Sequence, residues 1–407
     1  MEFILALFYL SGFLKSFLLF YDVPLPIDFT LLATLLLLTS LLFQFKRFQT
    51  SYSSNVILSM SFLLLLYIWM VMTLAYTPSI EYSKEKTQLF SLNIIAFLLP
   101  ILLRDFSFKV FFRIVVTISF LLSIHYVYLF NQFLIGIYSK ETFEGLKSFY
   151  LNCALIVGLH SLVLIFIKEP VFKKKGIDYF FAVFGVFLLL FLGARGPLLA
   201  FFVFLILYFL FKLFRLVPIP MFSIKKDIFS FRSVMVVNGV VFLLITLTSR
   251  FYSSFLLLLE RTIYRTNLIL GIGKQEADMG SSVNVRVEQV NLSIDYIFEN
   301  SSNFLFGSGI GGFGIIESGT DSRAYPHNVF LELWFELGIV GLLLFILFLF
   351  FALRGKGGLS YFGIILLAYI LFNISKSNSI VDLRVFFVIF AFYARKSNSE
   401  LIKLKQN

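Results

Sequence analysis

Residues 307–341 read GSGIGGFGIIESGTDSRAYPHNVFLELWFELGIVG. Glycines, a Pro-His-Asn triplet and acidic residues crowd there against the start of a long apolar run, whereas the rest of the chain is mostly Phe, Leu, Ile and Val. His327 is one of only three histidines, and a segment of membrane length follows it directly. We therefore expect the active site to be centred on His327.

The composition predicts an all-α polytopic integral membrane protein. Of the 407 residues, 59% are hydrophobic and only 14% are charged, while a soluble domain carries charge at about a quarter of its positions. Apolar runs of membrane-spanning length recur along the chain. The net charge of +11 does not point to nucleic acid, because Lys and Arg fall in short clusters between the apolar runs. The single cysteine permits no internal disulfide.

The apolar runs predict about twelve transmembrane helices. We place them at residues 3–21, 27–45, 55–76, 89–103, 108–130, 149–167, 177–194, 197–217, 233–249, 329–353, 359–375 and 380–394. The chain then divides into residues 1–249 with helices one to nine, a large loop at 250–328, and residues 329–407 with helices ten to twelve and a basic tail.

The basic residues predict the orientation. Every even-numbered span is followed by a basic loop, such as Lys46-Arg47 or Lys173 to Lys175. Loops rich in Lys and Arg stay on the cytoplasmic side, so both termini should be cytoplasmic and the 250–328 loop should face outward. Apart from the large loop, the outer loops would carry only a few basic residues, which are Lys84, Lys86, Lys140, Lys147 and Lys376.

The large loop has helical patterns of its own. Apolar residues recur every three or four positions from Val283 to Ile297, which predicts an amphipathic helix over 283–299. Val283, Val287, Val290, Ile294 and Ile297 would form its apolar face, and Arg286, Gln289 and Ser293 the opposite one. The segment RFYSSFLLLLERTIY at 250–264 favours a second helix at the membrane surface. The glycine run from 307 is expected to be non-helical and to let the backbone approach a ligand.

His327 is the candidate general base. Imidazole titrates near neutrality and can take a proton from a hydroxyl group at physiological pH. Pro326 restricts the turn before it, and Asn328 can cap the helix that follows. The alternative interpretation is a histidine that only caps a helix start.

Two arginines are candidates for binding phosphate. Arg195 lies in the turn GARGP between two spans, where a guanidinium held by flanking Gly and Pro suits bidentate recognition of an anion. The alternative is an anchor that reaches the lipid headgroups. Arg286 lies on the polar face of the predicted amphipathic helix, where taken alone it would be a solvated charge.

Further residues near His327 are candidates for substrate binding. These are Arg323, Tyr325, Asn328, Gly307, Gly309, Glu332 and Glu336. Arg323 could instead be a flexible loop charge, and the two glutamates, one turn apart, could either orient His327 or satisfy neighbouring helices. The sequence has no Cys/His metal cluster and no Walker loop, so we predict neither a metal nor a cofactor.

Taken together, these pieces resemble the bacterial O-antigen polymerase and ligase family. The resemblance rests on GARGP between two spans, on Arg286 followed by a helix and GSGIGGFG, and on PHNVFLELWFELGIVG. It implies a glycosyltransferase of the bacterial inner membrane, with its active site facing the periplasm. The donor would be a glycan on undecaprenyl pyrophosphate, and the acceptor another glycan or lipid.

The resemblance also implies roles for single residues. Arg195 and Arg286 would stabilise the charge that develops on the pyrophosphate, and His327 would deprotonate the acceptor hydroxyl in one inverting displacement. Membrane lipids and a chain-length-regulating co-polymerase would be further partners, and nucleic acid would not.

Three other functions stay open at this point. A ligase would transfer the finished glycan to lipid A–core, whereas the polymerase that we favour would transfer it to another lipid-linked repeat unit. A flippase for the same lipids is a non-enzymatic alternative, although transporters tend to have internal repeats and a site near the bilayer midplane. A structural partner in an export complex would need none of the candidate residues.

Overall fold

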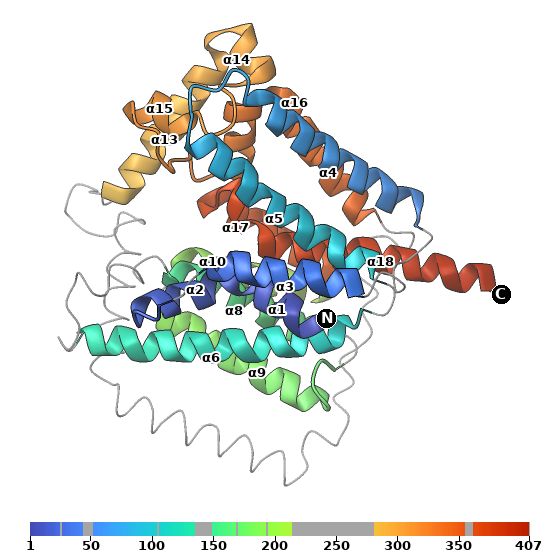
Figure 1. Cartoon of the computed structure of the whole chain (residues 1–407). Helices are drawn as coiled ribbons and strands as arrows, with labels where there is room; N and C mark the ends of the chain where they lie inside the picture. Colours follow the sequence, from blue (N-terminus) through green and yellow to red (C-terminus); the bar gives the residue numbers. More distant parts are fainter. Residues whose placement is uncertain are drawn as a thin grey trace. The chain divides into compact units, whose positions relative to one another are not determined.

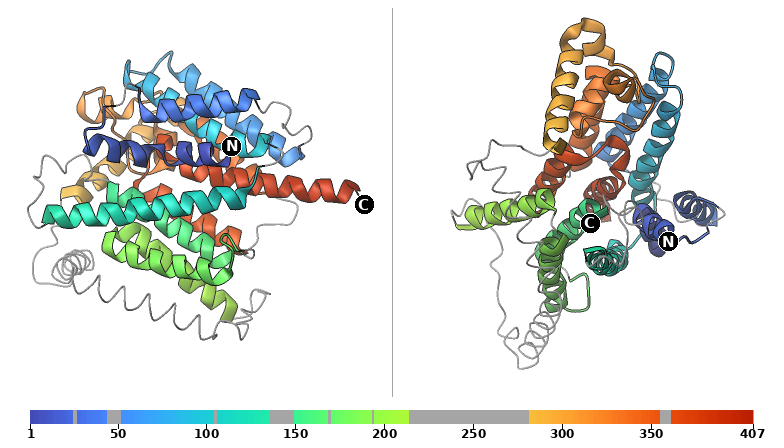
Figure 2. Two further views of the ribbon diagram at one scale, coloured as in Figure 1. Left: turned by 60° about the horizontal axis from the view of Figure 1, so that its bottom comes forward. Right: turned by 90° about the vertical axis from the view of Figure 1, so that its left-hand side faces the viewer.

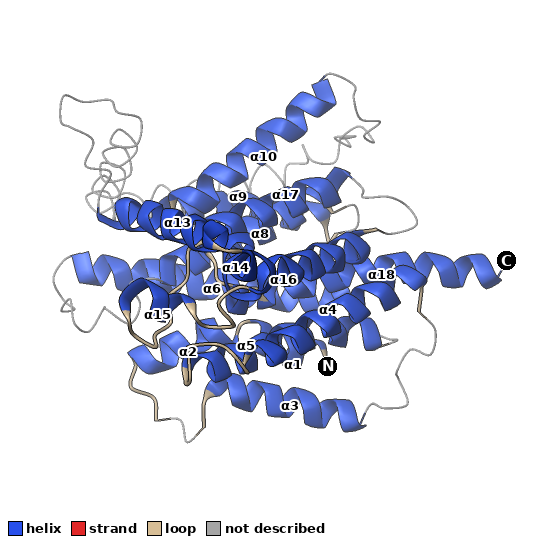
Figure 3. Cartoon of the chain, turned by 90° about the horizontal axis from the view of Figure 1, so that it is seen from above, coloured by secondary structure: helices blue, strands red, loops and turns tan. Residues whose placement is uncertain are grey.

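The computed structural model describes residues 1–24, 27–43, 52–103, 106–134, 149–167, 170–192, 194–213, 281–354 and 361–406. These residues form helices and connecting loops, and no strand occurs among them (Figure 3). The all-α prediction is therefore confirmed for this part of the chain. The ninth predicted span and the helix predicted at 250–264 lie outside the described residues.

Most of the predicted spans coincide with a helix. In chain order the helices are α1 Glu2–Tyr9, α2 Ser11–Phe20, α3 Phe29–Phe43, α4 Ser54–Thr73, α5 Tyr82–Leu102, α6 Phe108–Leu134, α8 Phe149–Phe166, α9 Lys175–Leu192, α10 Arg195–Leu213, α13 Ser281–Glu299, α14 Ser301–Phe306, α15 Phe313–Ser318, α16 Val329–Leu353, α17 Tyr361–Ser377, the 3₁₀ helix η3 Ile380–Asp382 and α18 Arg384–Gln406.

Six of the described helices are long and apolar enough to cross a membrane: α4, α5, α6, α8, α9 and α16. The pair α1 and α2 would make a seventh if it counts as one span, although the two helices are bent by 61°. Shorter apolar helices lie at Phe29–Phe43, Gly196–Leu207 and Leu366–Lys376. The chain is thus a multi-pass membrane protein, while the count of about twelve spans and the orientation stay predictions.

The chain forms two compact units. Unit 1 comprises residues 1–11, 27–111 and 279–407, and unit 2 comprises residues 12–26 and 112–278.

In unit 1, α16 packs along α4, and α5 packs along α18. Helix α13 and the short helices α14 and α15 gather around one end of α16 (Figures 1 and 2). Ile297 of α13, Phe313 of α15 and Phe335 of α16 form the buried centre of this group. An apolar core thus joins the residues of the predicted outer loop to the first turns of α16.

In unit 2, α8 and α9 pack together, and α10 contacts both. The Ser119 hydroxyl of α6 lies 2.9 Å from His160 Nδ1 of α8, and both residues are buried. Asp178 near the start of α9 accepts hydrogen bonds from the backbone N–H groups of Val171 and Phe172, each at 2.9 Å. The polar groups inside this unit are therefore used to join its helices and the loops between them.

Two predicted helix boundaries were wrong. The first apolar run is interrupted at Leu10 and forms two helices instead of one. The fourth predicted span begins at residue 82 instead of 89, so Lys84 and Lys86 are helical residues and not loop residues. The charged residues near position 86 suggested a loop. A charged side chain can nevertheless be buried between helices where it pairs with opposite charge.

The amphipathic helix was predicted correctly, but its buried face was not. Helix α13 covers Ser281–Glu299, yet Gln289 and Ser293 are buried, whereas Val287 and Ile294 are 47% and 43% exposed. The buried polar side chains are bonded, since Gln289 Nε2 donates to Glu317 Oε1 at 2.6 Å and Ser293 Oγ donates to its own helix. Periodicity located the helix but could not show which stripe its neighbours cover.

The glycine run was predicted to be non-helical throughout, which is only partly right. Residues 307–312 are non-helical, but Gly314 lies inside α15. The preceding residues form another short helix, α14, which ends at Gly307.

Candidate functional site

Helix α16 is broken at Gly338, whose backbone has φ 66° and ψ −174°. Such a break leaves carbonyl groups of the preceding turn without helical partners, and at membrane depth these must be bonded elsewhere. The N–H groups of Ser308 and Gly309 donate to the carbonyls of Phe335 and Glu336, both at 2.9 Å. The indole Nε1 of Trp69 on α4 donates to the carbonyl of Leu337, also at 2.9 Å. The break is therefore built into the packing of α4, α16 and the glycine run.

Gly307 and Gly309 make this contact sterically possible. Both have positive φ, 72° and 86°. A Cβ atom on Gly307 would lie 2.6 Å from the backbone carbon of Glu336, and one on Gly309 would lie 2.6 Å from Cα of Thr77. The close backbone approach predicted for these glycines is thus made to α16 and to the loop after α4. Their role in substrate binding stays a prediction, with the N–H of Gly309 already donating within the protein.

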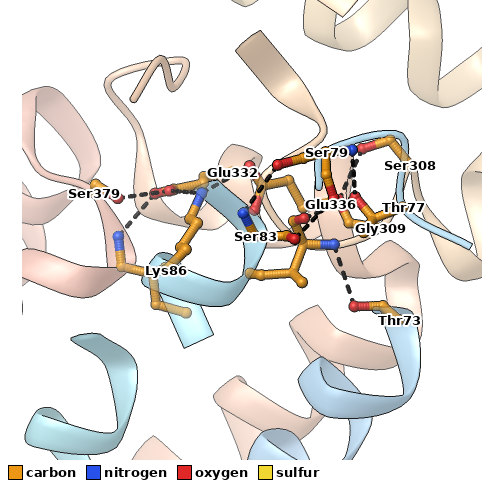
Figure 4. A network of polar contacts seen from close by, with 12 residues as sticks. Thr73, Thr77, Ser79, Ser83, Lys86, Ser308, Gly309, Glu332, Glu336 and Ser379 are labelled. Carbon is orange, nitrogen blue, oxygen red and sulfur yellow. Dashed lines mark hydrogen bonds and ion pairs between the residues drawn. The ribbon is translucent and has the colours of Figure 1, made fainter. Parts of the chain in front are cut away.

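A buried cluster of charges lies next to the break. Lys86 of α5 places its Nζ 2.7 Å from Glu332 Oε1 and 2.7 Å from Glu336 Oε1 (Figure 4). The three side chains are at most 1% exposed. Glu332 also accepts hydrogen bonds from the Ser379 hydroxyl at 2.6 Å and from the Ile380 N–H at 2.8 Å. The sequence left two roles open for the glutamates, and these contacts favour the role of satisfying neighbouring helices.

Sequence reasoning missed Lys86. The spacing of four between Glu332 and Glu336 places both acids on one helix face, and two carboxylates on a buried face need a cation. That signal was present in the sequence. Nothing in the sequence distinguished Lys86 as the partner from Lys84, which lies two residues earlier and is exposed.

The loop from Gly319 to Asn328 is tied to two neighbouring elements. Asp321 accepts hydrogen bonds from the Ser79 hydroxyl at 2.6 Å and from the N–H groups of Ile80 and Glu81 at 2.9 and 2.8 Å, at the start of α5. Arg323 pairs with Asp382 of η3 at 2.7 Å. Arg323 is therefore held in place instead of trailing as a free loop charge, although its side chain is still 50% exposed.

His327 lies where this loop enters α16. Its φ of 55° is in the left-handed region, which few residues other than glycine adopt. Its partly buried ring packs against that of Tyr325, with 4.5 Å between ring centroids. The predicted cap is confirmed, because the Asn328 side chain accepts from the N–H groups of Phe330 and Leu331 at 3.0 and 3.2 Å. The local backbone thus fixes the direction in which His327 leaves the helix start.

The charges that act on Tyr325 include that of Arg286, another predicted catalytic residue. Burial and the negative charges of Asp382 and Glu332 raise the pKa of Tyr325, the positive charges of Arg323 and Arg286 lower it, and the net result is a pKa of about 12. Arg286 on α13 is therefore close enough to act on the residue that packs against His327. A phenol with this pKa stays protonated near neutral pH, so Tyr325 is not the base of the site.

Arg195 is the first residue of α10 and belongs to unit 2, whereas Arg286 and His327 belong to unit 1. Two of the three predicted catalytic residues thus lie in the same unit, and the convergence of all three in one site stays a prediction. No group of three or more His, Cys, Asp or Glu side chains lies together among the described residues, and the absence of a metal also stays a prediction.

Comparison with known proteins bears on the same region. Residues 180–346 match the family model described as O-antigen ligase. This segment is less than half of the chain, and it contains Arg195, Arg286 and His327. No curated protein matches the sequence. The match supports the O-antigen ligase and polymerase family for this chain and indicates a function of that type.

Proposed function

We propose that this protein is a polysaccharide polymerase of the inner membrane. It transfers a glycan from undecaprenyl pyrophosphate to a hydroxyl group on the sugar of another lipid-linked repeat unit, on the periplasmic side. The observation that carries the proposal is the position of His327. Its backbone is left-handed at the capped start of α16, and its ring packs against Tyr325. The positive charge of Arg286 acts on the same tyrosine.

The chemistry needs a base and a stabiliser of negative charge. The acceptor oxygen attacks the anomeric carbon while the bond from that carbon to the pyrophosphate oxygen breaks. His327 takes the hydroxyl proton, and the leaving pyrophosphate carries away the bonding electron pair. Arg286 and Arg195 stabilise the charge on this leaving group. Attack from the face opposite the pyrophosphate inverts the anomeric carbon, and no metal or cofactor takes part.

A ligase is the second candidate, favoured by the description of the matching family. It would use the same donor, base and arginines, and would differ only in taking lipid A–core as its acceptor. The polymerase and the ligase are therefore separated by the acceptor and not by the groups around His327.

The test is glycan transfer by the purified full-length protein in detergent, with EDTA present and a polyprenyl-pyrophosphate-linked repeat unit as the only substrate. Wild type is compared with His327→Ala, which should lower the rate by about 100- to 10,000-fold. His125→Ala is the matched control, since His125 lies in unit 2, where it is bonded to Tyr21.

A ladder of longer lipid-linked glycans from wild type, lost in His327→Ala and kept in His125→Ala, supports the polymerase. Transfer that begins only when lipid A–core is added makes the protein a ligase. A full ladder from His327→Ala rules out His327 as the base. If wild type transfers to neither acceptor while it moves the lipid-linked unit across a vesicle membrane, the protein is a flippase and not an enzyme.

A further inference from the structure

The cluster of Lys86, Glu332 and Glu336 has an unbalanced formal charge. It contains two carboxyl groups and one ammonium group, all at most 1% exposed. With all three ionised, it would carry one negative charge that no partner in the cluster neutralises. An uncompensated charge in such a position is far more costly than a neutral acid, so a buried carboxyl group in excess tends to keep its proton.

The hydrogen bonds distinguish the two glutamates. Glu332 accepts from three donors: Lys86 Nζ, the Ser379 hydroxyl and the Ile380 N–H. Lys86 contacts Glu336 at Oε1, the backbone N–H of Gly311 also acts on this carboxyl group, and Oε2 is buried without a hydrogen bond from the described residues. Because donors stabilise the ionised form, the carboxylate is Glu332, and Glu336 is the better place for a proton.

Several groups surround Glu336. The ionisable ones are Lys86 and Tyr82 of α5 and Glu332 of its own helix, and the Tyr82 hydroxyl is also buried without a hydrogen bond in the described part of the chain. The glycine run contributes the backbone of Gly311. The hydroxyl groups of Thr73, at the end of α4, and Thr77, in the loop after it, are bonded to the backbone of Ile310.

We propose that this cluster is a proton-holding site in which Glu336 is a neutral acid, and that Lys86 is a positioning residue that ties α5 to the broken end of α16. The glycine run is bonded to the backbone of the same turn through Ser308 and Gly309. Asp321 joins the loop that carries His327 to the start of α5, one turn before Lys86. Lys86 thus links α5 and α16, the two helices to which the loop carrying His327 is attached.

The test is a charge-neutralising series on the full-length protein. Lys86→Met leaves the Glu332 carboxylate unpaired and should lower Tm by roughly 5 °C or more. Adding Glu332→Gln removes that charge and should restore most of the loss. Adding Glu336→Gln should restore little, because Glu336 already lacks a charge. Lys84→Met, the same change at an exposed position of the same helix, is the control and should leave Tm unchanged.

Tryptophan fluorescence is the appropriate readout. The chain has two tryptophans, and both bond to backbone carbonyls beside this cluster: Trp69 to Leu337 and Trp334 to Phe304. The emission therefore reports unfolding at the break of α16. If Lys86→Met does not accumulate, the same comparison is made between the two double variants, of which only Lys86→Met with Glu332→Gln should yield folded protein. Rescue by Glu336→Gln instead, equal rescue by both, or no effect of Lys86→Met would overturn the proposal.

A second readout concerns the reaction and rests on the proposed function. As pH rises, Glu336 loses its proton and the cluster gains a buried negative charge at the break. Each variant's transfer rate, divided by its own rate at pH 7, should therefore fall on the alkaline side in wild type and fall less in Glu336→Gln. Identical alkaline profiles would refute the proton-holding role of Glu336. A protein without any transfer activity would refute the proposed function alone, because the Tm series does not depend on it.

Discussion

Two polar regions of unit 1 are built in opposite ways. In the cluster of Lys86, Glu332 and Glu336, the side chains are at most 1% exposed and bond chiefly to one another and to neighbouring helices. In the loop from Gly319 to Asn328, polar side chains hold the two ends, and the ring of His327 between them is only partly buried.

The difference separates residues whose contacts hold helices together from residues that we propose to take part in the reaction. From the sequence, Glu332 and Glu336 could either orient His327 or satisfy neighbouring helices, and their contacts in the structure join α16 to α5 and η3. A polar residue close to a candidate base is therefore not part of the site by proximity alone. Substitutions in the two regions should change different quantities, stability in one and rate in the other.

The largest effect is expected from Gly338→Ala. The residue has positive φ, and a Cβ atom there would collide with the backbone of Leu305 and Phe306. Left-handed backbone costs a residue with a side chain about 1–2 kcal/mol, and the collision adds to it, so the free energy of unfolding should fall by about 3 kcal/mol or more. Thermal unfolding in detergent measures this. Gly12→Ala, where a Cβ meets nothing within 4 Å, is the control, and equal Tm values for both variants would contradict a tightly packed break.

Arg286→Ala should act on rate and not on stability. Loss of its positive charge should lower glycan transfer by roughly 100- to 1,000-fold, with Tm unchanged, because the side chain is only partly buried. Arg286→Lys should fall between the two, since it keeps the charge but loses the planar fork that binds phosphate. Glu288→Ala, an exposed change on the same helix, should leave the rate intact. A rate loss accompanied by a Tm loss would show that Arg286 stabilises the fold and would contradict a role limited to the reaction.

Asn328→Ala should have a smaller effect, on both the stability and the transfer rate. The side chain accepts two hydrogen bonds at the start of α16, and loss of such a cap costs about 1 kcal/mol. Asn328→Ser retains a capping oxygen and should recover most of the loss. Thermal unfolding tests the cap, and the transfer rate tests whether the backbone at His327 depends on it. A transfer rate that falls equally in both variants would show that the amide contacts substrate.

The smallest effect is expected from Asp321→Asn, and it should depend on pH. Burial raises the pKa of Asp321, but the hydrogen bonds from Ser79 and from the N–H groups of Glu81 and Ile80 outweigh it and hold the pKa below its ordinary value. The stabilisation is thus present above the ordinary aspartate pKa of about 3.9 and is lost as pH falls through the lower folded value. For this exposed group at a helix start we expect about 0.3–1 kcal/mol.

Tm measured between about pH 7 and pH 3 should therefore converge for wild type and Asp321→Asn on the acid side. Asp295→Asn, an exposed change on α13, should not alter Tm across this range. A difference that persists at low pH would mean that the Asp321 contacts do not need its charge.

The sequence by itself determined the class of the protein, most of the helices and the residue types of the site. Apolar length and period are properties of neighbouring residues, and a backbone in an apolar medium must bond within its own helix. The capping role of Asn328 follows from the same local rules. The family match covers the three residues that the sequence pattern had singled out as catalytic.

Only the tertiary structure decided which polar residue meets which. The partners of Glu336 and Asp321 lie about 240 to 250 positions away in the chain, at Lys86 and Ser79 to Glu81. The break at Gly338 is stabilised by donors from Ser308, Gly309 and Trp69. Periodicity describes one helix at a time, whereas burial, charge pairing and the bonding of a broken helix depend on the neighbours that packing brings to it.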